Sequence, residues 1–271
     1  MKRDALRMLL AVLLAVWAFP ACYDVDEPDD GWQPDEDAGT DTDTDTDTDT
    51  DTDTDTDTDT DTTCGEDEIV EFADPNLEAA VREAIGVPDG ALCADDLLGL
   101  TELDASVRTI TDLGGMEALT SLTVLYLYMN YITDLGPLAG LTALEHLEFT
   151  ANATLVDLGP LAGLTSLRFL GADECLFSDL TPLSGLTAVE VLYLAANQIE
   201  DVAPLAGLTS LSELYLNVNY ISDLAPLVEN EGLGAGDYVK VDMNDIDETA
   251  QAANIAALCD RGVEVNPYCT F

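Results

Sequence analysis

The sequence predicts an α/β solenoid, in which each turn of the chain contributes one short parallel strand to one face and a loop or 3-10 turn to the other. Three observations predict it. A 22-residue pattern, L-x-x-L-x-L-x-x-N-x-I, recurs, as in Leu122–Ile132 and Leu211–Ile221. The phrase DLGPLAGLT occurs unchanged at Asp134–Thr142 and Asp157–Thr165. A helical pattern flanks the repeat on each side, as solenoid ends require.

One slot of the pattern sets the number of turns. It recurs at steps of 22, 22, 23, 22, 22 and 25 residues and is held by Arg108, Asn130, Asn152, Cys175, Asn197, Asn219 and Asn244. The segment before each slot alternates like a short strand whose leucines point inward, and those leucines can be buried only against neighbouring turns. An Asn at the slot can bond backbone groups that the turn leaves unpaired. The repeats therefore cover residues 100–246, about seven turns.

Helical caps are expected at both ends of the repeat. Asp74 can cap a helix that begins at Pro75 and stops at Gly86, within an N-terminal cap over residues 64–99. A second helix is predicted at Glu248–Asp260, followed by a final strand, within a C-terminal cap over residues 247–271. The phrase DLGPLAGLT lies between strands, where Asp and Pro favour a tight turn and the leucines pack the convex wall. We interpret it as scaffold.

Two further segments precede the caps. Residues 1–21 have a basic start and a short apolar run, which is typical of a secretory signal peptide. The letters FPAC end at Cys22 and resemble the lipobox of bacterial lipoproteins, which implies acylation of Cys22; cleavage to a soluble exported protein is the alternative. Residues 22–63 are acidic and include a Thr-Asp alternation, a composition that predicts a disordered linker. Calcium binding or O-glycosylation of this tract stays open.

The repeat pattern matches the leucine-rich repeat, and more closely the bacterial internalin type with its 22-residue turns. The flanking sequences resemble the caps of secreted bacterial proteins of this kind. The resemblance implies a leucine-rich repeat solenoid that binds a partner, most often a protein or peptide, on its concave face. The signal peptide and the lipobox-like letters predict a cell-envelope protein, surface-exposed or in the outer membrane if lipid-anchored, or secreted if not. We expect a monomer.

Cysteine usage fits an oxidising compartment. Four of the cysteines, Cys64, Cys93, Cys259 and Cys269, allow three pairings. The two local ones, Cys64–Cys93 and Cys259–Cys269, are favoured. Cys175 occupies a repeat slot and is expected to be buried, although a reactive thiol is the alternative.

Charge and motifs narrow the functional classes. A formal net charge of -47 excludes duplex nucleic acid as a partner, because binding phosphates requires a basic surface. The sequence has a single histidine, His146, and none of the common catalytic or phosphate-binding motifs, so no enzyme activity and no cofactor are expected. The acidic stretch Asp242–Asp247 lacks the Gly and Glu of a calcium loop. Membrane association is expected only through a lipid at Cys22.

Candidate binding residues are the outward positions of the predicted strands. Aromatic side chains at exposed strand positions are typical of interface hot spots, although Tyr also favours strands for its own sake. The expected contact residues are Tyr126, Tyr128, His146, Glu148, Phe169, Asp173, Tyr193, Glu213, Tyr215, Asn217 and Tyr238. Tyr126, Tyr193 and Tyr215 are expected in one column, with Phe169 and Tyr238 in the adjacent one. The acidic rim of this surface predicts a protein or peptide partner with a basic or polar patch. The alternatives to protein binding are a structural spacer without a ligand and a glycan-binding module.

Overall fold

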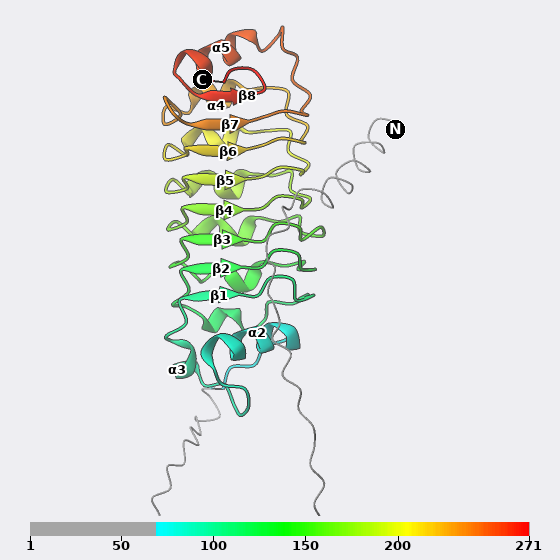
Figure 1. Ribbon diagram of the computed structural model, residues 1–271, viewed down its shortest axis with the longest axis vertical. Coiled ribbons are helices and arrows are strands. Elements are labelled where there is room, and N and C mark those ends of the chain that lie inside the picture. The colour runs from blue at the N-terminus through cyan, green and yellow to red at the C-terminus, as the bar shows by residue number, and fades with distance from the viewer. Residues whose placement is uncertain (1–68, 271) are drawn as a thin grey trace, which may run out of the picture. The chain divides into compact units, whose positions relative to one another are not determined.

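The chain forms one eight-stranded parallel sheet in the computed structural model, which describes residues 69–270 (Figure 1). Each strand pairs with the next one along the chain. The strands are β1 (Glu102–Asp104), β2 (Val124–Tyr126), β3 (His146–Glu148), β4 (Phe169–Gly171), β5 (Val191–Tyr193), β6 (Glu213–Tyr215), β7 (Tyr238–Lys240) and β8 (Glu264–Asn266). The first seven belong to the seven predicted turns. The eighth comes from the C-terminal cap, so the sheet extends one strand beyond the repeats.

Short helical turns form the opposite wall of the solenoid. They are η2 (Met116–Ala118), η3 (Gly136–Leu138), η4 (Gly159–Gly163), η5 (Thr181–Gly185), η6 (Ala203–Gly207) and the α-helical α4 (Ala225–Glu229). An Asp begins most of them and accepts a hydrogen bond from the backbone N–H two residues later, at 2.7 Å for Asp134 and Gly136. Pro follows where its fixed φ suits the first helical position. The repeated phrase is therefore a turn-forming element, as the sequence predicts.

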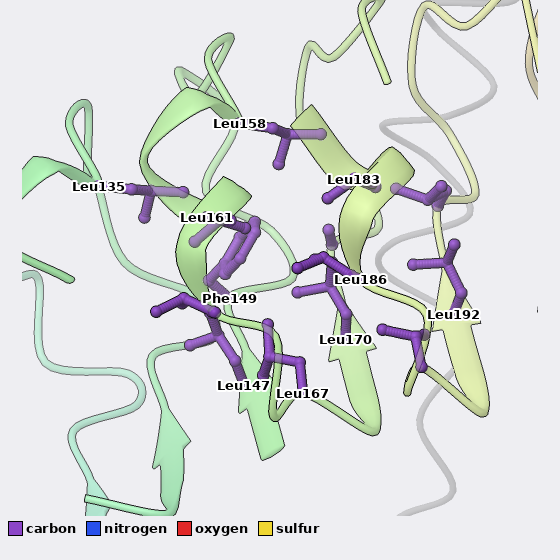
Figure 2. Packing of buried hydrophobic residues seen from close by; sticks show 14 of the residues in the cluster. Leu135, Leu147, Phe149, Leu158, Leu161, Leu167, Leu170, Leu183, Leu186 and Leu192 are labelled. Carbon is purple, nitrogen blue, oxygen red and sulfur yellow. The ribbon is translucent and has the colours of Figure 1, made fainter. Parts of the chain in front are cut away.

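Leucines from the strands and from the helical turns meet in one continuous core (Figure 2). Leu147 on β3 and Leu170 on β4 are fully buried, and so are Leu161 and Leu186 from η4 and the end of η5. Phe149 and Phe177 make an edge-to-face contact inside this core, with ring centroids 6.0 Å apart. Because each turn buries its leucines only against its neighbours, stability is distributed along the stack.

Asparagines at five of the repeated slots, four of them buried, join their turns to the neighbouring ones. Asn130 accepts hydrogen bonds from the N–H groups of Arg108 (3.1 Å) and Ile110 (2.9 Å), and it donates to the carbonyls of Ala105 and Leu127, both at 2.9 Å. Closely similar bonds are made by Asn152, Asn197, Asn219 and Asn244. One side chain thus satisfies backbone groups from two turns, which explains the amide at this slot.

Cys175 fits the slot because the step before it is 23 residues instead of 22. The extra residue lets the Leu155 N–H donate to the Asn152 carbonyl at 3.0 Å. In the preceding turn, the equivalent N–H of Ile132 donates to the Oδ1 atom of Asn152 instead. No side-chain acceptor is therefore required at position 175. The Cys175 thiol is buried, as expected, and burial raises its pKa to about 12, so the thiolate that would react is suppressed at neutral pH.

The residue before each slot has a left-handed backbone. The φ angles lie between 54° and 61° at Val107, Met129, Ala151, Glu174, Ala196, Val218 and Met243. None of these residues is glycine, and a left-handed conformation is unfavourable for a side chain with a Cβ, most of all when it is β-branched as in valine. The chain must turn sharply here to leave the strand. At the five turns where an asparagine follows, its hydrogen bonds hold that turn.

The N-terminal cap consists of α2 (Pro75–Ile85) and α3 (Ala94–Leu97). Asp74 caps α2 by accepting from the Asn76 N–H at 2.9 Å, and Gly86 ends it at φ 73°, both as the sequence predicts. Asp74 also accepts from the N–H of Thr111 at 2.8 Å, so the same carboxylate fastens the cap to the first repeat. These bonds outweigh the effect of burial and lower the pKa of Asp74.

The C-terminal cap consists of α5 (Ala252–Asp260) and β8. The predicted start at Glu248 is wrong: Asp247 accepts from the N–H of Thr249 at 2.9 Å, and this turn delays the helix to Ala252. A disulfide joins Cys259 to Cys269, with Cα atoms 6.1 Å apart. The chain after β8 folds back, and Cys269 exchanges two backbone hydrogen bonds with Val265. This return covers part of the last sheet edge.

Candidate functional site

The outward side of the sheet, here called the strand face, is the surface that the sequence predicts to be concave. Strand register arranges its side chains in two columns that run along the solenoid. The first contains Glu102, Val124, His146, Phe169, Val191, Glu213, Tyr238 and Glu264. The second contains Asp104, Tyr126, Glu148, Gly171, Tyr193, Tyr215, Lys240 and Asn266. The tyrosines therefore occupy the columns that the sequence predicts for them.

Six rings form one unbroken chain of contacts across this face, which we call the ring ladder. Its members, from β2 to β7, are Tyr126, His146, Phe169, Tyr193, Tyr215 and Tyr238. Successive ring centroids lie 5.0, 4.1, 5.2, 4.6 and 5.4 Å apart. Most contacts are tilted or edge-to-face, the arrangements that aromatic quadrupoles favour. The ladder crosses from the second column to the first, returns to the second at Tyr193, and ends in the first at Tyr238. Assignment to columns alone does not predict these contacts.

The middle of the ladder depends on Gly171. A Cβ atom at this position would lie 2.9 Å from Cγ of Glu148 and 3.2 Å from Cε1 of Phe169. The absence of a side chain therefore lets the Phe169 ring lean from the first column toward the second, where it meets Tyr193. On its other side Phe169 stacks on His146, with an interplanar angle of 3°. Gly171 thus allows the two columns of rings to join.

His146 has a more enclosed place than its predicted surface position suggests. Its ring lies between Tyr126 and Phe169, and its Nε2 atom is buried without a hydrogen-bond partner. Burial lowers the pKa of His146, and the charge of Glu102 opposes this effect only in part. The imidazole is therefore neutral at pH 7 and serves as an aromatic member of the ladder.

Carboxylates surround the tyrosines of the ladder. Burial raises the pKa of Tyr126, and the charges of Glu102, Glu148 and Asp104 raise it further. Burial raises the pKa of Glu148 as well, with the charge of Asp104 acting in the same direction. The strand face therefore combines apolar ring surface with negative charge.

Asp173 follows β4 and is partly buried beside the ladder. Burial raises the pKa of its carboxyl to about 7. A hydrogen bond from the Ala195 N–H opposes this rise, and so does the charge of Lys240. The charges of Glu174 and Glu148 raise the pKa further. This carboxyl consequently changes charge near neutral pH, which carboxylates in water do not.

The other predicted site residues lie outside the ring ladder or outside the described part of the chain. Tyr128 and Asn217 follow their strands and are partly buried, and Asn217 has an Oδ1 atom that is buried without a partner. Glu213 is exposed on β6. Cys93 is disulfide-bonded. Several predicted features lie outside the described residues: the signal peptide, the linker, Cys22 and Cys64. Asn152 is fully buried, as expected of a slot residue.

Sequence reasoning missed three features of the site. It did not predict the contact between His146 and Phe169, the need for glycine at position 171, or the raised pKa of Asp173. Gly171 is the one sequence feature that could have indicated this arrangement, because it stands in the second column between Glu148 and Tyr193, which are both large residues.

Within residues 69–270, no group of three or more His, Cys, Asp or Glu residues is arranged to hold a metal ion. The same part of the chain contains no helix with the length and apolar character needed to cross a bilayer.

Comparisons with known proteins agree with the repeat geometry. A family model described as leucine-rich repeats in two copies matches residues 187–229. The crystal structure of internalin InlF from Listeria monocytogenes is similar with a TM-score of 0.65 and 29% identity, over 72% of this chain and 55% of that one, so the chain spans about half of InlF. A leucine-rich repeat protein of Leptospira interrogans shares the fold, with a TM-score of 0.52 and 20% identity over 58% of this chain and 40% of that one. No curated protein sequence matches the chain.

Internalin C2 of Listeria monocytogenes is matched over most of its length. The two sequences are 32% identical, and the structures are similar with a TM-score of 0.54. The match covers 72% of this chain and 94% of internalin C2. On this likeness and on its own repeats, the chain belongs to the internalin-like leucine-rich repeat proteins.

Proposed function

We propose that this protein is an exported, lipid-anchored module that recognises a protein or peptide through its strand face. The ring ladder carries the proposal. The solenoid requires its inward leucines for stability, but the register makes no such demand on the outward positions, where six aromatic rings nevertheless join. Rigid aromatic surface of this kind is what hot spots in protein interfaces consist of.

Partner binding is also the general role of leucine-rich repeat domains. Their repeats supply a rigid, extended surface whose outward residues vary while the scaffold stays constant. Here the scaffold phrase is nearly invariant, whereas the first column changes from Glu102 to Val124, His146 and Phe169 within four strands. Such variation at outward positions favours a selective binding surface over a spacer without a ligand.

The binding test compares two sets of tyrosine substitutions in the full chain. The first variant, Tyr126→Ala with Tyr193→Ala and Tyr215→Ala, removes half of the ring ladder. The control, Tyr131→Ala with Tyr220→Ala, removes rings that lie outside the strands, where Tyr131 is 62% exposed. Wild type and both variants are used as bait for envelope and extracellular proteins, and captured proteins are quantified by mass spectrometry.

We expect a protein that wild type and the control capture and that the ladder variant does not. Its direct affinity for the ladder variant should be at least about tenfold weaker, the loss expected when one hot-spot residue is removed. Circular dichroism and thermal unfolding verify that the variant remains folded. Equal capture by all three proteins would contradict the proposal and favour a spacer. A ligand found only among glycans, on an array, would instead support the sugar-binding alternative.

The anchor is tested separately at Cys22. Metabolic labelling with an alkyne fatty acid should modify the wild-type chain and leave a Cys22→Ser variant unlabelled. Release of the unlabelled wild-type protein into the medium would refute the lipid anchor and favour a secreted protein. Neither result affects the binding proposal, because the strand face lies in the folded repeats.

A further inference from the structure

Two tyrosines of the ring ladder each lie between two carboxylates in the strand register. Tyr126 on β2 is paired with Asp104 on β1 and with Glu148 on β3. Tyr238 on β7 is paired with Glu213 on β6 and with Glu264 on β8. We call these triplets the first and second acidic tyrosine sites. They stand near opposite ends of the ladder.

Neighbouring strands in a sheet lie about 4.8 Å apart, so both carboxylates of a triplet are within reach of one cation above the ring. A Lys or Arg in that position gains from the ring face and from both carboxylates. Each site therefore has the composition that favours a positively charged side chain over a neutral one.

Most basic residues in the described part of the chain are already engaged elsewhere. Arg82 pairs with Glu78 at 2.8 Å, Arg108 with Glu83 at 2.7 Å, and Arg168 with Glu190 at 2.6 Å. Arg261 donates to the backbone carbonyls of Leu227 and Asn230. Lys240, on β7, is the only Lys or Arg on the strands described. It lies close to the second site, which leaves the first site with more uncompensated negative charge.

We infer that the partner presents an extended peptide segment with a Lys or Arg at each of the two acidic tyrosine sites. The inference rests on the proposed binding function and specifies the chemistry of its ligand. From β2 to β7 there are five strand spacings, or about 24 Å. An extended chain rises about 3.3 Å per residue, so the two basic residues are about seven or eight positions apart. Apolar side chains between them contact His146, Phe169 and Tyr193.

The test uses synthetic peptides with two arginines in an otherwise uncharged, apolar sequence. In one peptide the arginines are about eight residues apart, and in a second of identical composition they are about two residues apart. Affinity for the full chain is measured by fluorescence anisotropy at about 150 mM salt, where long-range attraction to the acidic protein is screened. The wide spacing should bind about tenfold more tightly than the narrow one, because only it reaches both sites.

Matched protein variants separate the two sites from net charge. Glu148→Gln with Glu213→Gln removes one carboxylate from each site. Glu200→Gln with Glu231→Gln removes the same total charge from exposed positions outside the strands. We expect the first variant to lose about tenfold in affinity for the wide-spaced peptide and the second less than about twofold. The substitutions conserve side-chain shape, and thermal unfolding verifies the fold.

Equal losses in the two variants, or equal affinity for the two peptides, would overturn the inference, because binding would then follow net charge alone. These outcomes differ from failure of the proposed function. If the ladder variant still loses its captured protein while the peptides show no preference, strand-face binding stands and the cationic ligand does not. A partner whose bound segment lacks Lys and Arg would overturn the inference in the same way.

Discussion

Asp173 provides a stringent test of the electrostatics at the strand face. The Asp173→Asn substitution removes its charge and keeps a side-chain oxygen that can accept from the Ala195 N–H. The groups that face this carboxyl are Glu174, Glu148 and Lys240. Because the folded chain holds a partly buried carboxylate among like charges, we expect the variant to be more stable than wild type at high pH.

The direction and size follow from linkage. Burial raises the pKa of Asp173 from 3.8 to about 7, so between these pH values the folded state binds the proton that the unfolded state has lost. Wild-type stability therefore falls as pH rises through this window, and the loss is complete above it. Three pH units correspond to about 4 kcal/mol. Since the side chain is only partly buried, we expect about half of this, or about 2 kcal/mol, at pH 8.

Urea unfolding at pH 4, 6 and 8 measures the effect, with ionic strength held constant. The midpoint difference between Asp173→Asn and wild type should be near zero at pH 4 and should grow until about pH 7, after which it levels off. An Asp89→Asn variant, which removes the same charge from an exposed loop, controls for net charge. A gain that is equal at pH 4 and pH 8, or a loss at pH 8, would refute the reasoning.

Three further predictions concern the scaffold and are measured by urea unfolding. Asn152→Ala should lower the free energy of unfolding by about 3 kcal/mol or more, because it leaves the buried Ile132 N–H and two carbonyls without partners. Cys175→Ala at the equivalent slot should lower it by only about 1 kcal/mol, and equal losses would contradict the account of the longer turn. Val107→Asn should stabilise by up to about 1 kcal/mol, because Asn tolerates the φ of 57° better than valine, and a loss would be contrary to this view. Gly232→Ala should destabilise the fold by several kcal/mol, because its Cβ atom would overlap the Thr209 carbonyl. Gly185→Ala has open space around its Cβ atom and should change stability little. Similar effects of the two substitutions would show that the turns adjust freely.

Much of the scaffold follows from the sequence because the repeat imposes one geometry on every turn. The leucine spacing predicts the strands, the Asn slots predict the bonds between turns, and Asp74 and Gly86 predict the limits of α2. The eighth strand was predicted only as part of a cap. The start of α5 was misplaced, because the turn formed by Asp247 was not apparent from helical periodicity alone.

The strand face was predictable in position but not in detail. The period fixes which residues point outward, and register then places them in columns. Contacts between columns depend on side-chain directions, and these depend in turn on space at a single position, Gly171. The raised pKa of Asp173 has a similar origin, since it requires charges from other strands and the depth of burial. Neither quantity is contained in a repeat pattern.

Hydroxyl-radical footprinting of the partner complex tests the central claim most directly, because it measures which aromatic side chains a partner covers. With a protein partner bound, oxidation of Tyr126, Tyr193 and Tyr215 should fall at least about threefold, as expected when a hot-spot cluster leaves solvent. Oxidation of Tyr131 and Tyr220, which lie outside the strands, should not change. Protection of these two residues with continued oxidation of the ladder would show that the partner binds elsewhere and would contradict the account.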